Sequence, residues 1–559
     1  MAILPIAVVE DPDFETISRF VTCLLNENLV AWTPLPCPVP SGSRASGILL
    51  HRTVGSKGGG IWVGTTVTIE SRHRLWYKAD LVRPILLQGP DVDAESDEVT
   101  NPRMLVDALR QILSVETKDR AWNQIALQLQ NSAENTATWY SWAKTQQVPT
   151  LQSPAIKWEQ STIRAHPLHP MQRAFAAQKP MAQLPPSEIP SLLTPQVSFL
   201  AVDRASTRIT GPFRRLLEPL LANFVLPPLY ENEIVLPCMS RQIPAIQQNF
   251  PSARVLLLDA FTAEAKANLR TVVVPPKLGF ECDMKLALAC TIGSTIRTIT
   301  PHTTCLGPEI SSVIHDLAPN DDTWVCRELA AITGSQSNCG EASHLSCMLR
   351  ENLEPRALAH GQRLIIAGAL AERMCGEMEC YAAVVFGLGD VAAKLDWFSE
   401  FTSKMIPPVL ALAVESGICL EAHGQNTLVR VDINTHRIMG VCFRDFGSIK
   451  CHMPTLRTRG HTLLSALPDC FLIEDQEEEA WDIVRHTLIH TQLQVLIRAL
   501  YIPPVEGWRI VREQLDNFFA TRPKSEMARR MRAFLFQPVV RHKAFVGMKL
   551  SPSRLEVRF

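Results

Sequence analysis

Apolar and polar positions alternate on both sides of a short polar segment near residue 435. Residues 427–433 and 438–443 are two mainly apolar runs rich in β-branched side chains, and the segment between them, 434–437, reads Asn-Thr-His-Arg. Two such runs separated by a short polar turn predict a β-hairpin.

The same patterns predict the other elements of the chain. Residues 285–292 alternate larger and smaller side chains, as a half-buried strand does. We also expect strands over residues 60–69 and 197–202, and helices over residues 103–113, 357–374 and 477–500. Prolines between residues 178 and 195 predict an extended connection. Because strands precede a region dominated by helical signals, we expect an α+β chain.

Composition narrows the class of protein. A chain of 559 residues with 46% hydrophobic content can bury a large core in two or three lobes. A net charge of −1 leaves no basic field for a nucleic acid. No apolar run reaches membrane-spanning length, the start lacks the positive region of a secretory signal, and the 15 cysteines are scattered like reduced thiols. We therefore expect a cytoplasmic protein that binds neither nucleic acid nor membrane.

Chemically active side chains gather at the open end of the predicted hairpin. An acid, an imidazole and two amides precede its first strand, and a guanidinium and an acid follow its second: Glu421, His423, Gln425, Asn426, Arg444 and Asp445. Such a set suits a polyphosphate, so an ATP-using enzyme is the leading hypothesis. A hydrogen-bonded hairpin mouth without catalytic function is the alternative.

The same segments partly match protein-kinase motifs. His423, Gly424 and Asn426 correspond to a catalytic loop, and the triplet 445–447 corresponds to the magnesium-binding Asp-Phe-Gly. A kinase needs a carboxylate that accepts the proton of the attacking hydroxyl, and Gln425 occupies that place. A substrate carboxylate is already ionised and needs no base, so the sequence favours carboxylate activation. A kinase-like phosphotransferase is retained as an alternative.

Two upstream segments offer further candidate groups. Residues 293–298 read GSTIRT and place hydroxyls and a guanidinium at a strand end, a combination that binds phosphate oxygens; a surface strand with ordinary turn hydroxyls is the alternative. In residues 165–170, AHPLHP, the prolines keep His166 and His169 off a common helical face. We expect a rigid loop that presents imidazoles to an anion or caps a core, rather than a zinc site.

The segments STIRAHPLHPMQ, GSTIRT, EAHGQN and RDFG occur in this order, and KAFVGMKL follows near the C-terminus. In this arrangement the chain resembles the NRPS-independent siderophore (NIS) synthetases of the aerobactin-synthetase, or IucA/IucC, type. The resemblance implies an α+β cupped hand, with a thumb at residues 1–145, fingers with an antiparallel sheet at 146–350, and a mostly helical palm at 351–559.

The resemblance also implies a chemistry. Family members use ATP and Mg²⁺ to adenylate a carboxylate of citrate or a related polycarboxylic acid, and pass the acyl group to an amine or a hydroxyl. A homodimer is a possible assembly. The implied roles are catalysis for His423 and Arg297, nucleotide binding for Ser294, Thr295, Thr298, Gln425, Asn426 and Arg444, substrate binding for His166, His169 and Arg173, and metal binding for Glu421 and Asp445.

Departures from the family pattern concern the substrate pocket and one charge. Arg173 replaces a lysine, and residues 237–242, PCMSRQ, lack the family's histidine and tryptophan. Glu309 stands where a basic residue is common, and a negative charge near the triphosphate would weaken anion binding unless Arg327 or His315 compensates. A noncatalytic ATP-binding descendant is therefore a second alternative.

Overall fold

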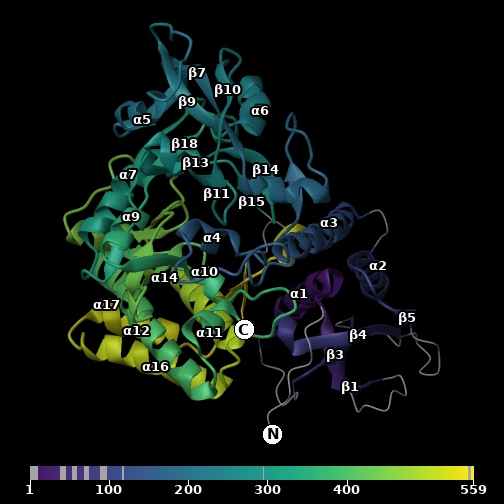
Figure 1. The fold of residues 1–559 in the computed structure, drawn as a ribbon. Helices are drawn as coiled ribbons and strands as arrows, with labels where there is room; N and C mark the ends of the chain where they lie inside the picture. The colour runs from purple at the N-terminus through teal and green to yellow at the C-terminus, as the bar shows by residue number, and fades with distance from the viewer. Residues whose placement is uncertain are drawn as a thin grey trace.

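The computed structural model describes residues 10–37, 46–52, 59–67, 75–88, 97–115, 119–293 and 295–551, and the backbone of 556–558. The chain forms three parts that meet at one junction (Figure 1). The N-terminal part is purple to blue, the central part is mostly teal, and the C-terminal part is green to yellow. Three clusters of buried apolar residues form the cores.

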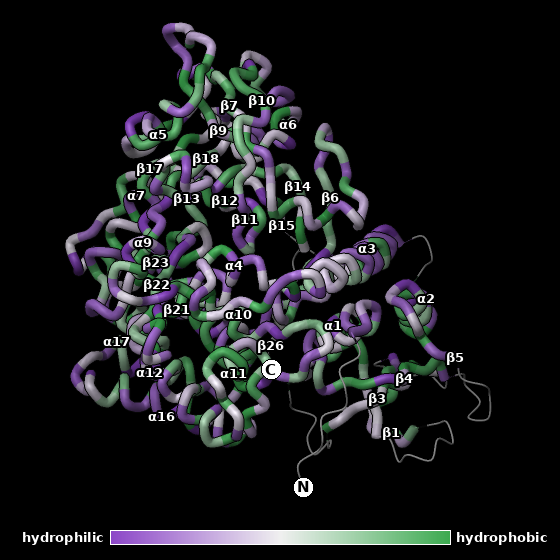
Figure 2. Tube along the Cα trace, in the orientation of Figure 1, coloured by the Kyte–Doolittle hydropathy of each residue, from purple (hydrophilic) through white to green (hydrophobic). Residues whose placement is uncertain are grey.

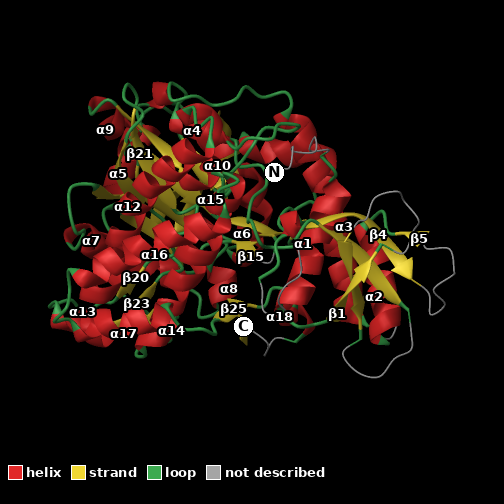
Figure 3. Cartoon of the chain, turned by 90° about the horizontal axis from the view of Figure 1, so that it is seen from below, coloured by secondary structure: helices red, strands yellow, loops and turns green. Residues whose placement is uncertain are grey.

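The N-terminal part is a five-stranded antiparallel sheet, in the order β1-β2-β3-β4-β5, with helices packed on it (Figure 3). Its elements are α1 (Pro12–Asn26), β1 (Ala31–Pro36), β2 (Ser46–His51), β3 (Gly60–Thr65), β4 (Leu81–Gln88), β5 (Asp97–Glu98), α2 (Pro102–Leu113) and α3 (Arg120–Ala143). Asp11 and Asn101 cap α1 and α2 by accepting hydrogen bonds from backbone N–H groups of the first turn, and a proline follows each cap.

The central part contains three antiparallel sheets, in the orders β10-β7-β9, β11-β12-β13-β18-β17-β8 and β15-β14-β6. Helix α7 packs against β17 of the six-stranded sheet. The elements are α4 (Ala155–Gln160), β6 (Phe175–Ala177), β7 (Gln196–Asp203), β8 (Thr207–Thr210), α5 (Phe213–Leu221), β9 (Glu233–Met239), α6 (Ile243–Asn249), β10 (Arg254–Thr262), β11 (Glu264–Ala265), β12 (Thr271–Val273), β13 (Cys282–Leu286), β14 (Leu288–Ile292), β15 (Thr295–Arg297), α7 (Pro301–Asp316), β16 (Thr323–Val325), β17 (Glu328–Gly334), α8 (Cys339–Ala342) and β18 (Cys347–Glu351).

The C-terminal part packs helices around the hairpin of β21 and β22. The two strands form the middle of the four-stranded sheet β16-β22-β21-β19, and the long helix α12 packs against β22. The elements are α9 (Glu354–Ala359), β19 (Gln362–Ile366), α10 (Ala367–Leu370), α11 (Tyr381–Phe386), α12 (Val391–Ser416), β20 (Ile418–Cys419), β21 (Thr427–Asp432), β22 (Ile438–Phe443), β23 (Lys450–His452), α13 (Met453–Thr458), β24 (Ile473–Glu474), α14 (Glu477–Val484), the π-helical segment η6 (Arg485–Leu493), α15 (Gln494–Ala499), α16 (Pro504–Ala520), α17 (Glu526–Leu535), β25 (Arg541–Lys543), α18 (Gly547–Leu550) and β26 (Glu556–Arg558).

The end of the chain returns to the N-terminal part. Phe545 and Val546 are buried in the same cluster as the apolar face of α1. The Glu27 carboxylate at the end of α1 accepts hydrogen bonds from the backbone N–H groups of Val546 and Gly547. The KAFVGMKL segment therefore lies at the junction of the three parts. In Figure 2 much of the apolar sequence, drawn green, lies on the strands and helices that line the cores.

Most of the predicted elements are confirmed. The hairpin forms with β21 and β22 as its strands, and the α+β class with antiparallel sheets is also confirmed. The strand at 197–202 and the helix at 103–113 lie within β7 and α2, and residues 477–499 form a continuous helical run whose middle is η6. The strand expected at 60–69 is β3, although residues 68–70 lie outside the described part.

Three predictions are wrong. The connection expected to be extended over residues 178–195 contains the 3₁₀ helix η2 (Pro186–Leu193). Residues 285–292 form no single half-buried strand: the chain breaks at Ala287, and β13 and β14 belong to different sheets. Both strands are buried almost throughout, so alternation in side-chain size did not mark a solvent face. The helix expected at 357–374 is instead α9, β19 and α10, because Gly361, with φ 67°, ends α9 before an apolar strand.

The domain boundaries at residues 145 and 350 stay predictions. Among the helices of the described residues, none is both long enough and apolar enough to cross a membrane.

Candidate active site

The loop before β21 orients His423 through its own backbone. The Glu421 carboxylate accepts a hydrogen bond from the Asn426 amide at 3.1 Å, and His423 Nδ1 accepts one from the backbone N–H of Gln425 at 3.1 Å. Nε2 is then the imidazole nitrogen that carries the hydrogen, 3.7 Å from Glu421 Oε1. Gly424 lets the loop pack closely, because a β-carbon there would collide with the neighbouring backbone.

Asp445 follows β22 in the left-handed backbone region, with φ 64°. Its Oδ1 forms an ion pair with Nζ of Lys285, on β13, at 2.5 Å. Burial alone would raise the pKa of Asp445, but the charges of Lys285 and then Arg270 hold this pKa well below its usual range. Asp445 is therefore ionised at neutral pH, and its ion pair joins the segment after the hairpin to the central sheet.

Two arginines lie near each other at the end of the central sheet. Arg297 donates a hydrogen bond to the Ile292 carbonyl at 3.4 Å, and Arg270 donates one to the Thr298 carbonyl. The Nε atom of each arginine is buried without a hydrogen-bond partner among the described residues. Burial, followed by the charge of Arg270, lowers the pKa of Arg297 to about 10. These two cations have donors to spare, which an anion would satisfy.

Two threonines of the GSTIRT segment lie at least partly at the surface. Thr295 is exposed and Thr298 is half-buried. Ser294 lies outside the described residues. Their nucleotide-binding roles stay predictions.

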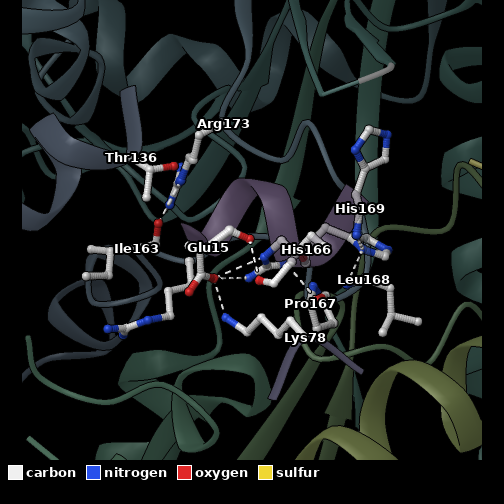
Figure 4. A network of polar contacts seen from close by, with 12 residues as sticks. Glu15, Lys78, Thr136, Ile163, His166, Pro167, Leu168, His169 and Arg173 are labelled. Atoms are coloured by element: carbon white, nitrogen blue, oxygen red, sulfur yellow. Dashed lines mark hydrogen bonds and ion pairs between the residues drawn. The ribbon is translucent and has the colours of Figure 1, made fainter. Parts of the chain in front are cut away.

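The HPLHP loop packs its two imidazoles against Phe545 of the C-terminal segment. The ring centroids of His166 and His169 lie 5.5 and 5.1 Å from that of Phe545. His166 Nδ1 accepts a hydrogen bond from the backbone N–H of His169 at 3.1 Å. The Arg19 guanidinium of α1 donates to the carbonyls of His166 and Pro167, each at 2.6 Å. Figure 4 shows this loop and Glu15 of α1 in one network of polar contacts. The loop is thus held rigidly, as the prolines predict.

Both imidazoles of this loop are neutral at pH 7. Burial lowers the pKa of His169 to about 3 and that of His166 well below its ordinary value. His169 Nε2 is buried without a hydrogen-bond partner among the described residues, and its ring borders the turn at Gly293 that leads to Arg297. The loop therefore caps a core and also keeps one imidazole nitrogen beside the GSTIRT segment.

Arg173 and Arg444 are engaged inside the protein. Arg173 donates to the Ile163 and Thr162 carbonyls, both at 2.7 Å, and lies over the Trp139 ring. Burial lowers the pKa of Arg173 to about 10.

Arg444 forms a buried ion pair with Glu159 on α4 and donates to the backbone carbonyl of Gln425 at 2.8 Å. These contacts use donors of both arginines inside the protein; the substrate-binding role expected of Arg173 and the nucleotide-binding role expected of Arg444 stay predictions.

Two lysines at the site received no role from the sequence. Lys285 is only 1% exposed, and a lysine inside an apolar strand is itself an unusual signal, because lysine is rarely buried without a partner. The Lys543 ammonium lies 5.7 Å from the Phe545 ring centroid. Its charge acts on Glu421, His166 and other groups of the site. Lys543 stands in the KAFVGMKL segment, which the sequence linked to the family without naming a function.

The family departures have local explanations. The Glu309 carboxylate accepts hydrogen bonds from the backbone N–H groups of Leu464 at 2.9 Å and Ser465 at 2.7 Å, so its charge holds a loop of the C-terminal part. Arg327 pairs with Glu351 instead of compensating for it. His315 is exposed in the last turn of α7.

In the PCMSRQ segment, Gln242 is buried and bonds the Ala289 N–H at 2.6 Å and the His344 carbonyl at 3.1 Å. This glutamine supports the sheet.

The acidic groups fit magnesium better than a metal held by protein ligands alone. Among the described residues, no three His, Cys, Asp or Glu side chains converge closely enough to hold a metal ion. Glu421 and Asp445 supply two carboxylates close enough to repel each other. Burial raises the pKa of Glu421, and the charge of Asp445 raises it further. Magnesium needs only one or two carboxylates when waters and phosphates complete its shell, so the two acids fit it.

The four motifs meet in space although they are spread over the chain. Lys285 of the central sheet forms an ion pair with Asp445, and the charges of Arg297 and Asp445 attract each other. The charge of His423 lowers the pKa of His166, and the His169 ring borders the turn before Arg297. The result is a junction with surplus positive charge, a pair of acids and fixed neutral imidazoles. That arrangement can bind a polyanion and stabilise negative charge that develops beside it.

The chain matches two family models and several curated proteins. Residues 238–372 match the IucA / IucC family, and residues 395–556 match the family described as ferric iron reductase FhuF-like transporter. The chain is 35% identical over 484 residues to the NRPS-independent siderophore synthetase-like protein ankE of Aspergillus thermomutatus, covering 84% of this chain and 79% of ankE. It is 32% identical over 425 residues to the NRPS-independent siderophore synthetase rfs of Rhizopus delemar, covering 74% of this chain and 66% of rfs.

A solved structure shares the fold. The ATP-bound aerobactin synthetase IucA of Klebsiella pneumoniae matches with a TM-score of 0.75 over 99% of each chain, at 14% identity. This likeness extends through all three parts of the chain and confirms the expected fold.

Proposed function

Because the chain belongs to the IucA/IucC family of NRPS-independent siderophore synthetases, we propose that it is an ATP-dependent ligase that forms AMP. It adenylates a carboxylate of citrate or a related polycarboxylic acid and then joins the acyl group to an amine or a hydroxyl. The observation that supports this most strongly is the meeting of the HPLHP, GSTIRT, EAHGQN and RDFG segments at one junction.

The reaction consists of two displacements. In the first, a carboxylate oxygen attacks the α-phosphorus of ATP, the bond to the bridging oxygen breaks, and pyrophosphate leaves. In the second, an amine or hydroxyl attacks the acyl carbon, AMP leaves, and the nucleophile loses its proton. The first displacement requires no base, because the attacking carboxylate is already ionised, and this agrees with Gln425 in place of a kinase aspartate.

Each side chain of the site has a proposed task. Arg297 and Nε2 of His423 stabilise the charge that grows on the α-phosphate, with Arg270 and Lys285 adding positive charge. Asn426 and Gln425, with the GSTIRT hydroxyls, hold the nucleotide.

The substrate carboxylates are assigned to His166, His169 and Lys543. Arg173 and Arg444 keep the two loops in place through their internal hydrogen bonds.

Glu421 and Asp445 are the residues that would hold Mg²⁺. The ion, when bound with the nucleotide, neutralises the pyrophosphate leaving group. A cytoplasmic location and assembly as a homodimer belong to the same proposal, and cell fractionation and light scattering test them.

The products formed from ATP distinguish adenylation from phosphoryl transfer. Purified protein with ATP, Mg²⁺, hydroxylamine and a panel of polycarboxylic acids is expected to yield a hydroxamate of one acid together with AMP and pyrophosphate in equal amounts. ADP and orthophosphate as the sole nucleotide products would contradict adenylation and favour a phosphotransferase. ATP binding without turnover on any acid would favour a noncatalytic descendant.

A further inference from the structure

A buried acid lies next to the site without a charged partner. Glu328 begins β17 and is only 1% exposed. Neither of its carboxylate oxygens bonds to another side chain among the described residues. Burial raises the pKa of Glu328 to about 7, although the charge of Lys285 acts to lower this pKa. Burying a carboxyl group without a hydrogen-bond partner is unfavourable in free energy, which indicates that Glu328 has a functional role.

Helix α7 packs closely over the Glu328 side chain. Gly307 of α7 packs over Glu328, and a β-carbon at Gly307 would collide with Glu328 Oε2. Gly447 packs against Thr303 of the same helix. The carboxylate therefore lies in a space bounded by the six-stranded sheet, α7 and the RDFG segment, with no room for bulk water beside Gly307.

Lys285 is the cation that acts most strongly on Glu328. Their strands, β13 and β17, flank β18, and the cross-strand partners Asp283, Arg350 and Glu328 form a row across the three strands. Lys285 follows Asp283 by two residues, so its side chain leaves the same face of the sheet. Lys285 is 1% exposed, and its ammonium is paired with Asp445.

We propose that Lys285 exchanges one carboxylate for another when a magnesium-bound nucleotide enters. In the empty site the Lys285 ammonium neutralises Asp445, and it moves to Glu328 when the metal takes its place at Asp445. This inference rests on the proposed function, since it requires Asp445 to hold the metal. Glu328 is then a positioning residue that touches neither metal nor substrate.

The physical reason is electrostatic. A metal ion and an ammonium cannot both sit against one carboxylate oxygen without strong repulsion. A buried ammonium left without a partner is strongly unfavourable, as is a buried carboxylate without one. The exchange solves both problems in one movement, because the displaced cation meets the unpaired acid.

The test measures metal binding, which is independent of turnover. Mn²⁺ serves as the probe, followed by electron paramagnetic resonance in the presence of α,β-methylene ATP, which the enzyme cannot cleave. Glu328→Gln keeps the shape of the side chain but removes the charge that receives Lys285, so Mn²⁺ binding is expected to weaken by about tenfold or more. Glu351→Gln is the matched control, because Glu351 pairs with Arg327 on the same sheet; its Mn²⁺ affinity is expected to stay at the wild-type value.

A double-mutant cycle isolates the exchange from other effects of Glu328. Without Lys285 no ammonium has to be moved, so Glu328→Gln is expected to change Mn²⁺ affinity less than about twofold in a Lys285→Met background. Equal weakening in both backgrounds would overturn the inference, as would an unchanged affinity in Glu328→Gln alone. The single variant and its control still decide the matter if Lys285→Met fails to fold.

Failure of the proposed function is recognised separately. Wild-type protein that binds no Mn²⁺ with the nucleotide analogue would overturn the nucleotide site and this inference together. Wild-type binding with an unaffected Glu328→Gln variant would overturn the inference alone.

Discussion

At the scale of single residues, the arginines near the site fall into two groups: those whose donors bond to the protein itself, and those with donors that could bind a ligand. Arg173 and Arg444 use their donors internally, whereas Arg297 and Arg270 each bury an Nε without a partner in the described part of the chain. The sequence does not distinguish these four arginines, but in the structure only Arg297 and Arg270 have buried donors without a partner among the described residues.

Arg297→Ala is expected to lower acid-dependent AMP formation by about 10²–10³, the scale for losing one preorganised donor to a developing charge. Arg208→Ala, an exposed arginine of β8, is the control and should leave the rate unchanged. Initial rates of hydroxamate formation measure both. An unchanged rate in folded Arg297→Ala would make the GSTIRT segment an ordinary surface strand.

His423→Ala is expected to keep thermal stability within about 1–2 kcal/mol of wild type and to reduce AMP formation strongly, because the half-buried imidazole fills no core. Asp445→Asn should reduce the rate as well and raise the Mg²⁺ concentration needed for half-maximal activity.

Calorimetry and Mg²⁺ titrations measure these effects, with His315→Ala, an exposed histidine of α7, as control. Unfolding of His423→Ala, or full adenylation by it, would place the active site elsewhere.

At the scale of elements, the hairpin depends on a contact with a distant helix. Arg444, after β22, pairs with Glu159 of α4 and bonds the carbonyl of Gln425, before β21. One guanidinium thus closes the open end of the hairpin and fixes it to the central part.

Arg444→Ala is expected to destabilise the protein by about 3–5 kcal/mol, because Glu159 would be left buried without its partner. The double variant Glu159→Gln with Arg444→Met should recover most of this loss. Urea unfolding followed by tryptophan fluorescence measures the difference. Unaltered stability of Arg444→Ala combined with lost ATP binding would contradict this structural role and support the direct nucleotide contact expected from the sequence.

At the scale of the whole molecule, histidines concentrate where the three parts meet. His169 belongs to the HPLHP loop, His490 to the π-helical segment η6 and His542 to β25. Burial lowers the pKa of His169 and His490 to about 3 and that of His542 to about 4. The charges of Lys543 and Lys549 lower the pKa of His169 further.

This junction is expected to make the protein sensitive to mild acid. Above pH 6.5, the ordinary pKa of histidine, these imidazoles are neutral in both the folded and the unfolded chain. As the pH falls below that value, only the unfolded chain takes up protons, and stability is lost progressively down to the folded-state pKa values. At pH 5 the buried His169 and His542 each remove about 1–2 kcal/mol.

Urea midpoints between pH 7.5 and 5 measure this loss, in a range where ordinary carboxylates stay ionised. His542→Gln should flatten the pH dependence relative to wild type. A midpoint that does not change over this range, or a variant with the wild-type slope, would contradict the prediction.

The sequence by itself determined the local structure and the family. Apolar periodicity located the hairpin, β7 and the helix α2, because period-two and helical patterns report which neighbouring positions face a core. The ordered motifs identified the fold and predicted the residues of the nucleotide site. The failures at 285–292 and 357–374 arose where apolar residues fill both faces, so that periodicity carries no directional information.

Only the tertiary structure decided which charged side chains serve the site and which serve the fold. Lys285 reaches Asp445 across 160 positions of sequence, and Arg444 reaches Glu159 across 285. Lys543 joins the site because the end of the chain packs against α1. Pairing between long charged side chains depends on through-space distance and burial, neither of which a local pattern encodes.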